Sequence, residues 1–478
     1  MKFTILSHAG LLVEHNGVQI LVDPWLRGSC YWRSWWNFPA PDPSLYEGLQ
    51  PDYIYITHFH WDHFQSPSLR LFSRDTPILV ARFYNDRMIQ DLHYLGFKNT
   101  TEIPHGGRFD LGMGLVLHSF QFGLLPDSAI VLTDGKTVLF DVNDCKLVGL
   151  PLKQVTGRFP KIDFVLRSHS SAHAIPYCIE GYERDFSELR QPKDYAEEFT
   201  NFALHVGARH AIPFASNHCF LHRETEKFNA TVSSPEEVRR VFDDRVRELG
   251  LESDCSLMPP GSSWDDTQGF DKRTFDYDRK DEYIAELKRR HESLLRGYYD
   301  EEDQEALDAE ALRKYFGIFF RSLPRVLSWW KPIRVKFSIR EANDMSYWLL
   351  DFRFRRLDLA DAITDADIEI SVGAKIINDC TRINMFASLA PSKRLSIKLK
   401  DKSRIADVWY FMYVLEQFEY EVLPLRKNLR LRSVGVRLRR WREAVEFLKI
   451  LVRYKVMGRQ FRIADMYPPA PGFKRPIP

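Results

Sequence analysis

The segment Thr57-His58-Phe59-His60-Trp61-Asp62-His63 places three imidazoles and a carboxylate within six consecutive residues. It directly follows Asp52-Tyr53-Ile54-Tyr55-Ile56, a short apolar run typical of a buried strand. In an extended segment His58 and His60 point to the same side and can bind one metal ion, while Asp62 and His63 can turn back to a second. Imidazole and carboxylate suit zinc, iron or manganese, and a cluster without cysteine argues against a closed structural zinc site. The segment predicts a two-metal site at the C-terminal end of a strand.

A two-metal centre needs further ligands, and we expect each from another strand end. His118, in Val116-Leu117-His118-Ser119-Phe120, is the candidate third ligand of the first metal. Its alternative role is that of a packing histidine. Asp144 follows the strand-like run from Val138 and is the candidate bridging carboxylate, with Asp141 as runner-up because either could cap the turn.

Four more histidines compete for the last ligand position on the second metal. His218 and His222 lie in one cluster, and we favour His222 slightly. His169 and His173 form another cluster. Since there are more candidates than positions, we expect His169, His173 and His218 to contact substrate or to support the ligands from behind.

The loop from Trp25 to Pro39 is rich in tryptophan and arginine. Trp25 and Trp36 offer flat faces that suit sugar rings or bases, and Arg27 and Arg33 suit phosphate or carboxylate. The alternative is that these side chains pack the loop against a second domain. If the loop overhangs the site, a sugar or nucleotide-sugar substrate is expected.

At 478 residues the chain exceeds what one core usually organises, so we expect two domains, 1–268 and 269–478. A hydrophobic fraction of 44% and a charged fraction of 28% fit a globular protein, and no apolar run is long enough for a membrane helix. Six scattered cysteines form no CxxC pair, and the N-terminus has no signal-peptide pattern. These features predict a cytoplasmic location.

Short apolar runs separated by turns dominate the first half and predict sheet-on-sheet packing with helices outside. Residues 265–282 read as a linker, and the rest predicts an α+β domain without a metal cluster. A net charge of +2 makes nucleic acid an unlikely partner. Arg426 to Arg442 is the local exception: we expect a solvated strand that enters an amphipathic run from Trp441 to Val456, or a site for a nucleotide, phosphate or membrane surface.

The order of Leu21-Val22-Asp23-Pro24-Trp25-Leu26, the His-x-His-x-Asp-His cluster and a strand ending in Asp144 resembles the metallo-β-lactamase superfamily over roughly residues 1–265. The resemblance implies an αββα sandwich, here with an additional C-terminal α+β domain. It implies two divalent metal ions, most simply zinc, with iron as the alternative. Asp62 and His63 would be catalytic as well as ligands. The implied ligand sets are His58, His60 and His118 for one ion, Asp62, His63 and His222 for the other, and Asp144 between them.

Within that superfamily, Asp23-Pro24-Trp25-Leu26-Arg27-Gly28 and Asp144-Cys145 resemble the CMP-N-acetylneuraminic acid hydroxylases, which carry a Rieske iron–sulfur domain. Cys219-Phe220-Leu221-His222 fits half of a Rieske motif, but no Cys-x-His occurs to complete it, so we expect no Rieske cluster in this chain. The resemblance therefore implies either a dinuclear hydrolase acting on a sugar-like substrate or an iron-dependent oxygenase component fed electrons by a separate Rieske partner or by none. A third interpretation is a binding module with a vestigial metal site, and a homodimer is compatible with each.

Overall fold

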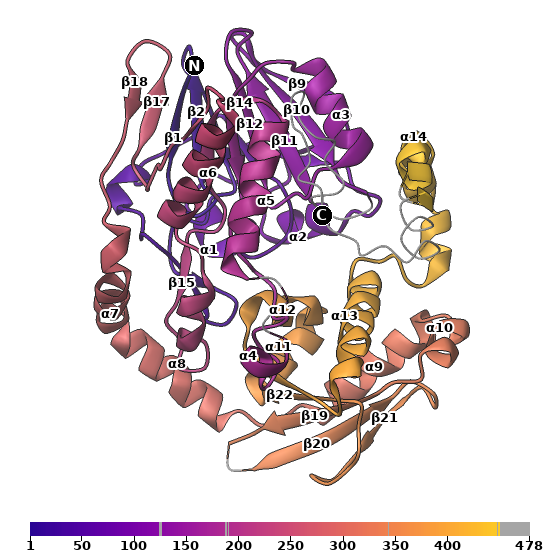
Figure 1. Ribbon diagram of the computed structural model, residues 1–478. Coiled ribbons are helices and arrows are strands. Elements are labelled where there is room, and N and C mark those ends of the chain that lie inside the picture. The colour runs from indigo at the N-terminus through magenta and orange to yellow at the C-terminus, as the bar shows by residue number, and fades with distance from the viewer. Residues whose placement is uncertain (124–126, 187–188, 190, 343, 447, 450–478) are drawn as a thin grey trace.

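The computed structural model describes residues 1–449 except 124–126, 187–188, 190, 343 and 447. Two sheets face each other in its N-terminal half (Figure 1). The first sheet runs in the order β18 (Gly269–Asp271), β17 (Ser263–Asp265), β1 (Lys2–Ile5), β2 (Leu11–His15), β3 (Val18–Val22), β6 (Tyr53–Ile56), β7 (Ile78–Ala81) and β8 (Thr100–Ile103). The second runs in the order β16 (Asp254–Cys255), β14 (Ala208–Pro213), β13 (Ile162–Arg167), β12 (Val138–Asn143), β11 (Ser128–Thr133), β10 (Leu115–Gln121) and β9 (Gly107–Gly112).

Alternation along the strands builds the core between these sheets. Phe3 and Val13 of the first sheet meet Leu117 and Leu139 of the second in one buried cluster. The opposite face of each sheet is apolar too, because helices cover it. Helix α2 (Arg87–Tyr94) packs on the first sheet, and α3 (Gly149–Arg158), α5 (Pro192–His205) and α6 (Pro235–Leu249) pack on the second. The expected αββα sandwich is confirmed.

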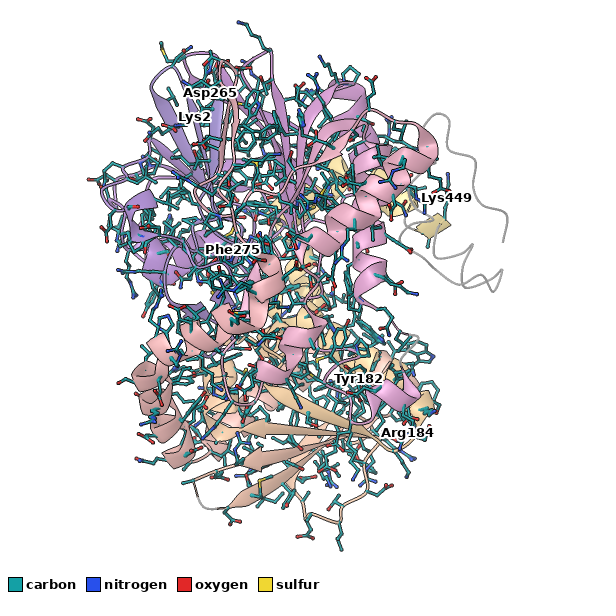
Figure 2. The ribbon with its side chains drawn as sticks, turned by 60° about the vertical axis from the view of Figure 1, so that its left-hand side comes forward. Lys2, Tyr182, Arg184, Asp265, Phe275 and Lys449 are labelled. Atoms are coloured by element: carbon teal, nitrogen blue, oxygen red, sulfur yellow. The ribbon has the colours of Figure 1, made fainter. Side chains whose placement is uncertain are left out.

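The predicted linker is partly wrong. Residues 263–271 form the hairpin of β17 and β18, which extends the first sheet by pairing with β1, and residues 277–282 are a 3-10 turn and the start of α7 (Lys280–Arg290), so only 272–276 are irregular. Lys2 and Asp265 are register partners across β1 and β17, as their neighbouring positions in Figure 2 show. Trp264 stacks on Phe3 at 5.8 Å between ring centroids, so the hairpin closes one end of the core.

A five-stranded sheet organises the C-terminal half, in the order β21 (Arg356–Leu359), β20 (Met345–Asp351), β19 (Arg334–Arg340), β22 (Ile368–Gly373) and β23 (Leu395–Leu399). Its helices are α9 (Ala309–Ser322), α10 (Arg325–Trp330), α11 (Ala374–Ile383), α12 (Leu389–Ser392) and α13 (Ile405–Glu419), and α7 (Lys280–Arg290) and α8 (Glu292–Gln304) lead into it. The remaining helices are α1 (Ser66–Leu69), α4 (Tyr182–Asp185), α14 (Leu431–Arg439) and the short 3-10 turns Pro43–Leu45, Glu226–Thr231, Tyr277–Arg279, Phe386–Ser388, Lys402–Arg404 and Leu425–Leu429. The expected mixture of helix and strand in this half is confirmed.

The two halves share a core. A small sheet of β15 (His218–Phe220), β5 (Trp35–Asn37) and β4 (Ser29–Cys30) lies between them. Trp25, Trp35 and Phe220 belong to the same buried cluster as Phe337 and Phe411 of the C-terminal half. Ile179 bridges to Ile397, and Tyr182 and Arg184 of the adjoining α4 lie beside the C-terminal sheet in Figure 2. The boundary at 268/269 stays a prediction, but packing crosses it extensively.

The basic stretch before Trp441 is helical, not the expected strand. Leu425–Leu429 is a 3-10 turn and α14 follows it directly. The alternation of arginine with apolar residues misled the sequence prediction, because it covers too few residues to separate a period of 2 from a period of 3.6. Residue 447 and residues 450–456 of the amphipathic run lie outside the described residues. None of the described helices is long and apolar enough to cross a membrane.

Candidate metal centre

Strand ends from both sheets converge on one edge of the sandwich. Strands β1, β3 and β6 run in the same direction in the first sheet, and β12, β13 and β14 do so in the second. The residues that follow these strands therefore meet at one edge. Two sets of three potential ligands form there, together with Asp144, which follows β12.

The first set consists of His58, His60 and Asp127, whose ligand atoms lie within 4.8 Å of one another. His58 Nδ1 lies 2.9 Å from Thr57 Oγ1, and His58 Nε2 is buried without a hydrogen-bond partner among the described residues. Burial and the imidazoles of His63 and His60 hold the pKa of His58 well below its usual value. A neutral, unpartnered imidazole nitrogen is what metal ligation requires.

The second set consists of His8, Asp62 and His63. Asp62 Oδ2 lies 3.3 Å from His8 Nε2 and 3.2 Å from His63 Nε2. Asp144 Oδ2 lies 3.3 Å from His63 Nε2 and also groups with His58. Asp144 thus reaches histidines of both sets, which is the position expected of a bridging carboxylate.

Asp23 fixes the candidate ligand His63 through the ring nitrogen that faces away from the centre. Its Oδ2 lies 2.8 Å from His63 Nδ1 and accepts hydrogen bonds from Thr57 Oγ1 at 2.6 Å and Asn143 Nδ2 at 2.6 Å. With Nδ1–H donated to Asp23, His63 presents Nε2 to the centre. Such carboxylate–imidazole contacts fix the tautomer and orientation of metal-binding histidines.

A strained turn brings Tyr31 onto the second set. Tyr31, Trp32 and Arg33 have φ of 51°, 55° and 61°, which is costly for consecutive residues with side chains. The Tyr31 hydroxyl donates to Asp62 Oδ1 at 2.6 Å, and its ring stacks on Trp61. Trp32 Nε1 donates to Asp379 of the C-terminal half at 3.0 Å. The turn thus connects the second set to the second domain.

Three further imidazole faces remain unsatisfied near this edge. Both ring nitrogens of His169 and His218 are buried without a hydrogen bond among the described residues, as is Nδ1 of His8, whose Nε2 lies beside Asp62. Burial lowers the pKa of His169 to about 3 and that of His218 well below its usual value, so both are neutral. His218 stacks on Trp35, with 3.7 Å between ring centroids, and lies 5.7 Å from His8. Buried polar atoms usually have partners, so this concentration of free imidazole nitrogens beside carboxylates fits a bound cation and ligand.

His118 lies outside the centre, contrary to expectation. It projects from β10 on the face opposite Leu117, where its Nδ1 lies 3.1 Å from Arg158 Nη1 and its ring meets Phe159. Burial and Arg158 lower its pKa to about 4. Neighbouring residues of a strand point to opposite faces, so a shift of one residue in register decides whether His118 faces the metal centre or the helices outside. Asp127, in the loop after β10, occupies the place that His118 was expected to fill.

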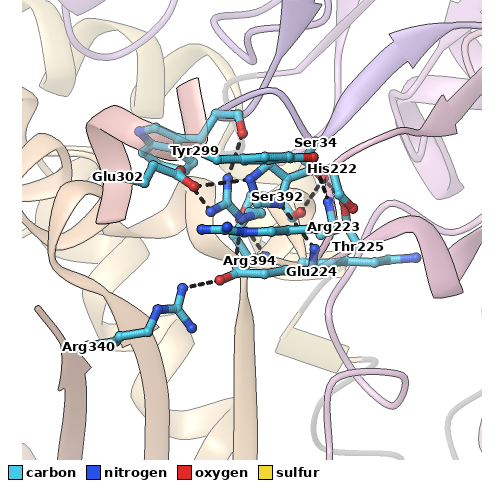
Figure 3. Close-up of polar contacts among 12 residues, drawn as sticks. Ser34, His222, Arg223, Glu224, Thr225, Tyr299, Glu302, Arg340, Ser392 and Arg394 are labelled. Carbon is cyan, nitrogen blue, oxygen red and sulfur yellow. Dashed lines mark hydrogen bonds and ion pairs between the residues drawn. The ribbon is translucent and has the colours of Figure 1, made fainter. Parts of the chain in front are cut away.

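His222 also lies elsewhere, in what we call the Arg394 network: His222, Glu224, Glu302, Arg340 and Arg394 (Figure 3). Its Nε2 lies 3.0 Å from Glu302 Oε2, and its Nδ1 accepts from the Glu224 backbone N–H at 3.2 Å. Arg394 donates to Glu224 at 2.7 Å and to Glu302 at 2.8 Å. Both ring nitrogens of His222 are therefore engaged in a contact between the two halves, and His222 is not placed to bind the second metal.

The other predicted residues are distributed as follows. Trp25 packs 5.3 Å from His8, beside the centre. Arg27 is exposed and donates to Pro67 O at 3.2 Å. Arg33 lies over Tyr298 and Trp36 over His291, so both pack against α8 or its start, as the alternative interpretation of the loop expected. His173 stacks on Trp409. Asp141 is buried, and burial raises its pKa well above the usual value.

Sequence reasoning missed His8, Asp23, Tyr31 and Asp127 as members of this site. Ser7-His8 directly follows the first strand, so a rule that inspects every strand end would have found His8. Asp127 has no such signal, because it precedes a strand in a loop whose path is set by tertiary contacts.

The comparisons with known proteins agree with this arrangement. Residues 2–122 match the family model of the Beta-lactamase superfamily domain. The N-terminal region is thus similar to that domain over about a quarter of the chain. The ligand candidates up to His63 lie within the matched segment, and Asp127 and Asp144 follow it.

The curated proteins that this chain resembles include a Rieske-named protein and a hydroxylase. A Mycobacterium tuberculosis protein named as a Rieske 2Fe-2S iron-sulfur protein is 30% identical over 282 residues, 56% of this chain and 54% of that one. The cytidine monophosphate-N-acetylneuraminic acid hydroxylase of Mus musculus is 32% identical over 156 residues, 30% of this chain and 26% of that one. The chain thus spans about half the length of the first relative and about a quarter of the second. A solved isothiocyanate hydrolase from Delia radicum gut bacteria is 16% identical with a TM-score of 0.41, covering 55% of this chain and 99% of that one.

Proposed function

We propose that this chain is an iron-dependent oxygenase, or the catalytic component of one, that hydroxylates a small polar substrate at a dinuclear centre. The supporting observation is that each ligand set contains two imidazoles and one carboxylate: His58, His60 and Asp127, and His8, His63 and Asp62. Two histidines and one carboxylate leave open positions for oxygen and substrate and are typical of non-haem iron oxygenases. The three imidazoles that the superfamily resemblance implied for the first metal are not assembled.

Iron bound in these sets would supply the oxygen activation. The overall reaction would consume one O2, two electrons and two protons, and would yield a hydroxylated substrate and water. The identity with a protein named as a Rieske iron–sulfur protein supports a 2Fe–2S protein as the class of electron donor. Residues 1–478 contain no Cys-x-His, so the proposed 2Fe–2S centre would lie outside these residues.

The chain's own residues orient and shield the site. Asp23 holds His63 in one tautomer, and Tyr31 holds Asp62 through its hydroxyl. Phe59 packs 5.1 Å from Tyr420 at the end of α13, so the C-terminal domain covers the histidine turn. Exclusion of water strengthens electrostatic interactions in such a site and limits side reactions.

A sugar or nucleotide-sugar substrate is the proposed class. The similarity to CMP-N-acetylneuraminic acid hydroxylase supports it, because that enzyme's name specifies such a substrate. The free ring nitrogens of His169 and His218 beside His8 could donate to and accept from sugar hydroxyls.

The second candidate function is a dinuclear hydrolase with zinc. Its support is Asp144, which groups with His58 and His63 and could bridge two ions. Two close metal ions make a bound water acidic enough to attack at neutral pH. Zinc also accepts two histidines with one carboxylate, so the identity of the retained metal distinguishes this hydrolase from the oxygenase.

Metal analysis with an oxygen electrode tests the proposal. Protein produced with iron and zinc both supplied should retain two iron ions per chain and should consume oxygen when a reductant and a nucleotide sugar are added. Asp127→Ala and Asp62→Ala should each lose metal, and His118→Ala is the matched control that should retain it. Two zinc ions with hydrolysis of an ester or phosphoester would favour the second candidate, and no bound metal would overturn both.

A further inference from the structure

Helix α14 turns arginines inward. Arg432 Nε donates to the Phe83 carbonyl at 3.0 Å, and its guanidinium pairs with Glu102. Arg440 Nη2 donates to the Gln121 carbonyl at 2.9 Å. Between them Ser433 is only 1% exposed. The inward face of the helix is therefore held to the N-terminal domain by polar contacts.

The outward face of the same helix and its continuation is apolar. We call it the α14 stripe: Leu431, Leu438, Trp441, Val445 and Leu448, which are 92%, 67%, 56%, 39% and 59% exposed. Leu431 and Leu438 are seven residues apart on α14, and Trp441, Val445 and Leu448 are spaced by four and three in the helical residues after Arg440, so each group fits one face of its helical segment. A surface helix normally has the opposite polarity, with its apolar stripe toward the core. Contiguous exposed apolar side chains of this kind mark a docking surface.

The charge around the stripe is positive and only partly compensated. Residues 425–442 contain eight lysines and arginines and no acidic residue. Arg426, Arg439 and Arg442 are exposed, and none has a carboxylate partner in the part of the chain that the structure describes. Residues 425–478 hold 15 basic and three acidic residues, although the whole chain carries a net charge of only +2. The basic charge is thus concentrated in this segment.

We propose that the α14 stripe and its flanking arginines dock on the surface of an anionic lipid bilayer. Apolar side chains flanked by cations bind lipid headgroup regions, where leucine and tryptophan insert and arginine meets acidic headgroups. Pairing of two copies through the stripe would bring like charges together, so charge favours an anionic surface over a second copy. Nucleic acid would use the arginines but leave the apolar stripe exposed.

Helix α10 carries a second group of exposed tryptophans. Trp329 is 81% exposed and Trp330 62%, and α10 and α14 both lie on the right-hand side of Figure 1. Arg325 begins α10 and has no carboxylate partner in the described residues. Tryptophan is favoured at membrane–water interfaces, so α10 fits as an additional contact.

Vesicle co-sedimentation of the full chain tests the proposal. We expect binding to vesicles of phosphatidylcholine with phosphatidylserine and none to phosphatidylcholine alone. The triple variant Leu431→Ser, Leu438→Ser and Trp441→Ser should lower partitioning at least about 100-fold. The variant Arg426→Gln, Arg439→Gln and Arg442→Gln should lower it about 100-fold as well, since each basic residue contributes about one kcal/mol near such a surface.

Matched controls remove equivalent groups elsewhere. Tyr94→Ser and Ile363→Ser remove side chains that are 90% and 94% exposed, and Arg209→Gln, Arg239→Gln and Arg240→Gln remove exposed cations. Both controls should bind as the parent does, and circular dichroism should show every variant folded. Equal binding to neutral vesicles, binding that survives loss of the stripe, or a concentration-dependent dimer abolished by the stripe variant would each overturn the proposal.

Discussion

The candidate metal centre and the Arg394 network are both buried groups of imidazole and carboxylate, but their hydrogen bonding differs. In the Arg394 network both nitrogens of His222 have partners, and Arg394 satisfies Glu224 and Glu302. In the candidate metal centre His58 Nε2 and His8 Nδ1 have no hydrogen-bond partner among the described residues. The same residue types therefore serve two roles, and the unsatisfied atoms distinguish them. A network in which every buried polar atom has a hydrogen-bond partner holds the domains together, whereas buried atoms without partners indicate a place for a ligand.

Removal of a metal ligand gives the largest expected effect. Asp62→Ala removes the carboxylate between His8 and His63 and should lower metal-dependent activity by about 1000-fold or more, since an incomplete ligand set neither holds nor orients the ion. Elemental analysis should show fewer ions per chain, with an unfolding midpoint for the metal-free form close to that of the parent. Unchanged metal content would mean that this set is not a ligand set.

Arg394→Met should act on stability and leave metal content per folded chain unchanged. It removes the guanidinium that Glu302 and Glu224 share and leaves them with only His222 and Arg340, and breaking such a buried pair costs up to about 3–5 kcal/mol. Urea unfolding measures the change. The control Arg223→Met removes an exposed pair with Asp303 and should cost less than about 1 kcal/mol. Equal losses of unfolding free energy from Arg394→Met and Arg223→Met would contradict the conclusion that the buried network stabilises the fold more than the exposed pair does.

Acid should weaken the Arg394 network in a defined pH window. Burial raises the pKa of Glu224, but Arg394 and Arg340 lower it more, to about 2 from 4.5. Its contribution to stability is therefore fully present above pH 4.5 and is lost as the pH falls toward about 2. The loss is at most ~3 kcal/mol. Urea unfolding at a series of pH values should show this fall in the parent and a smaller one in Arg394→Met.

Asp23→Asn tests the residues behind the ligands. The amide keeps the size of the side chain but weakens the contact that fixes His63, so metal affinity should fall about 10- to 100-fold. Competition with a chelator measures the affinity. The fold should persist, because Thr57 and Asn143 retain a polar partner; an affinity equal to the parent's would show that Asp23 does not support His63.

The smallest expected effect belongs to His118. His118→Gln should leave metal content within error and change the free energy of unfolding by less than about 1 kcal/mol, because its partners are Arg158 and Phe159 at the edge of α3. Loss of one metal ion in this variant would restore the original assignment and overturn the role given to Asp127.

The sequence was most informative where a short segment contains the whole signal. The turn from His58 to His63 and the strand before it could be predicted, since backbone N–H bonds from His63 and Phe64 to the His60 carbonyl form a local turn. The layered fold also followed from short apolar runs. Asp144 could be placed beside the turn because both follow strands of the sandwich.

Long-range choices were not predictable in the same way. The face of β10 on which His118 lies takes it away from the metal centre, and the path of the following loop brings Asp127 to it. Local sequence spacing fixes neither the face nor the loop path. His222 looked like a ligand because its partner Glu302 lies 80 positions away in the chain, and Arg394, which donates to Glu302, lies 172 positions away. The sequence predicts a strand where α14 lies, because a short alternating run of arginine and apolar residues fits the strand period of 2 as well as the helix period of 3.6.

The left-handed turn of Tyr31, Trp32 and Arg33 limits which parts of the chain can be exchanged between related proteins. One residue of the turn supports a metal-ligand carboxylate and the next is bonded to the C-terminal domain. A recombination point placed in the loop after β18 would separate these two halves in sequence while leaving them dependent on each other in space. Chimeras that exchange only one half would therefore disturb the geometry around Asp62, so the turn and α11 would have to be transferred together.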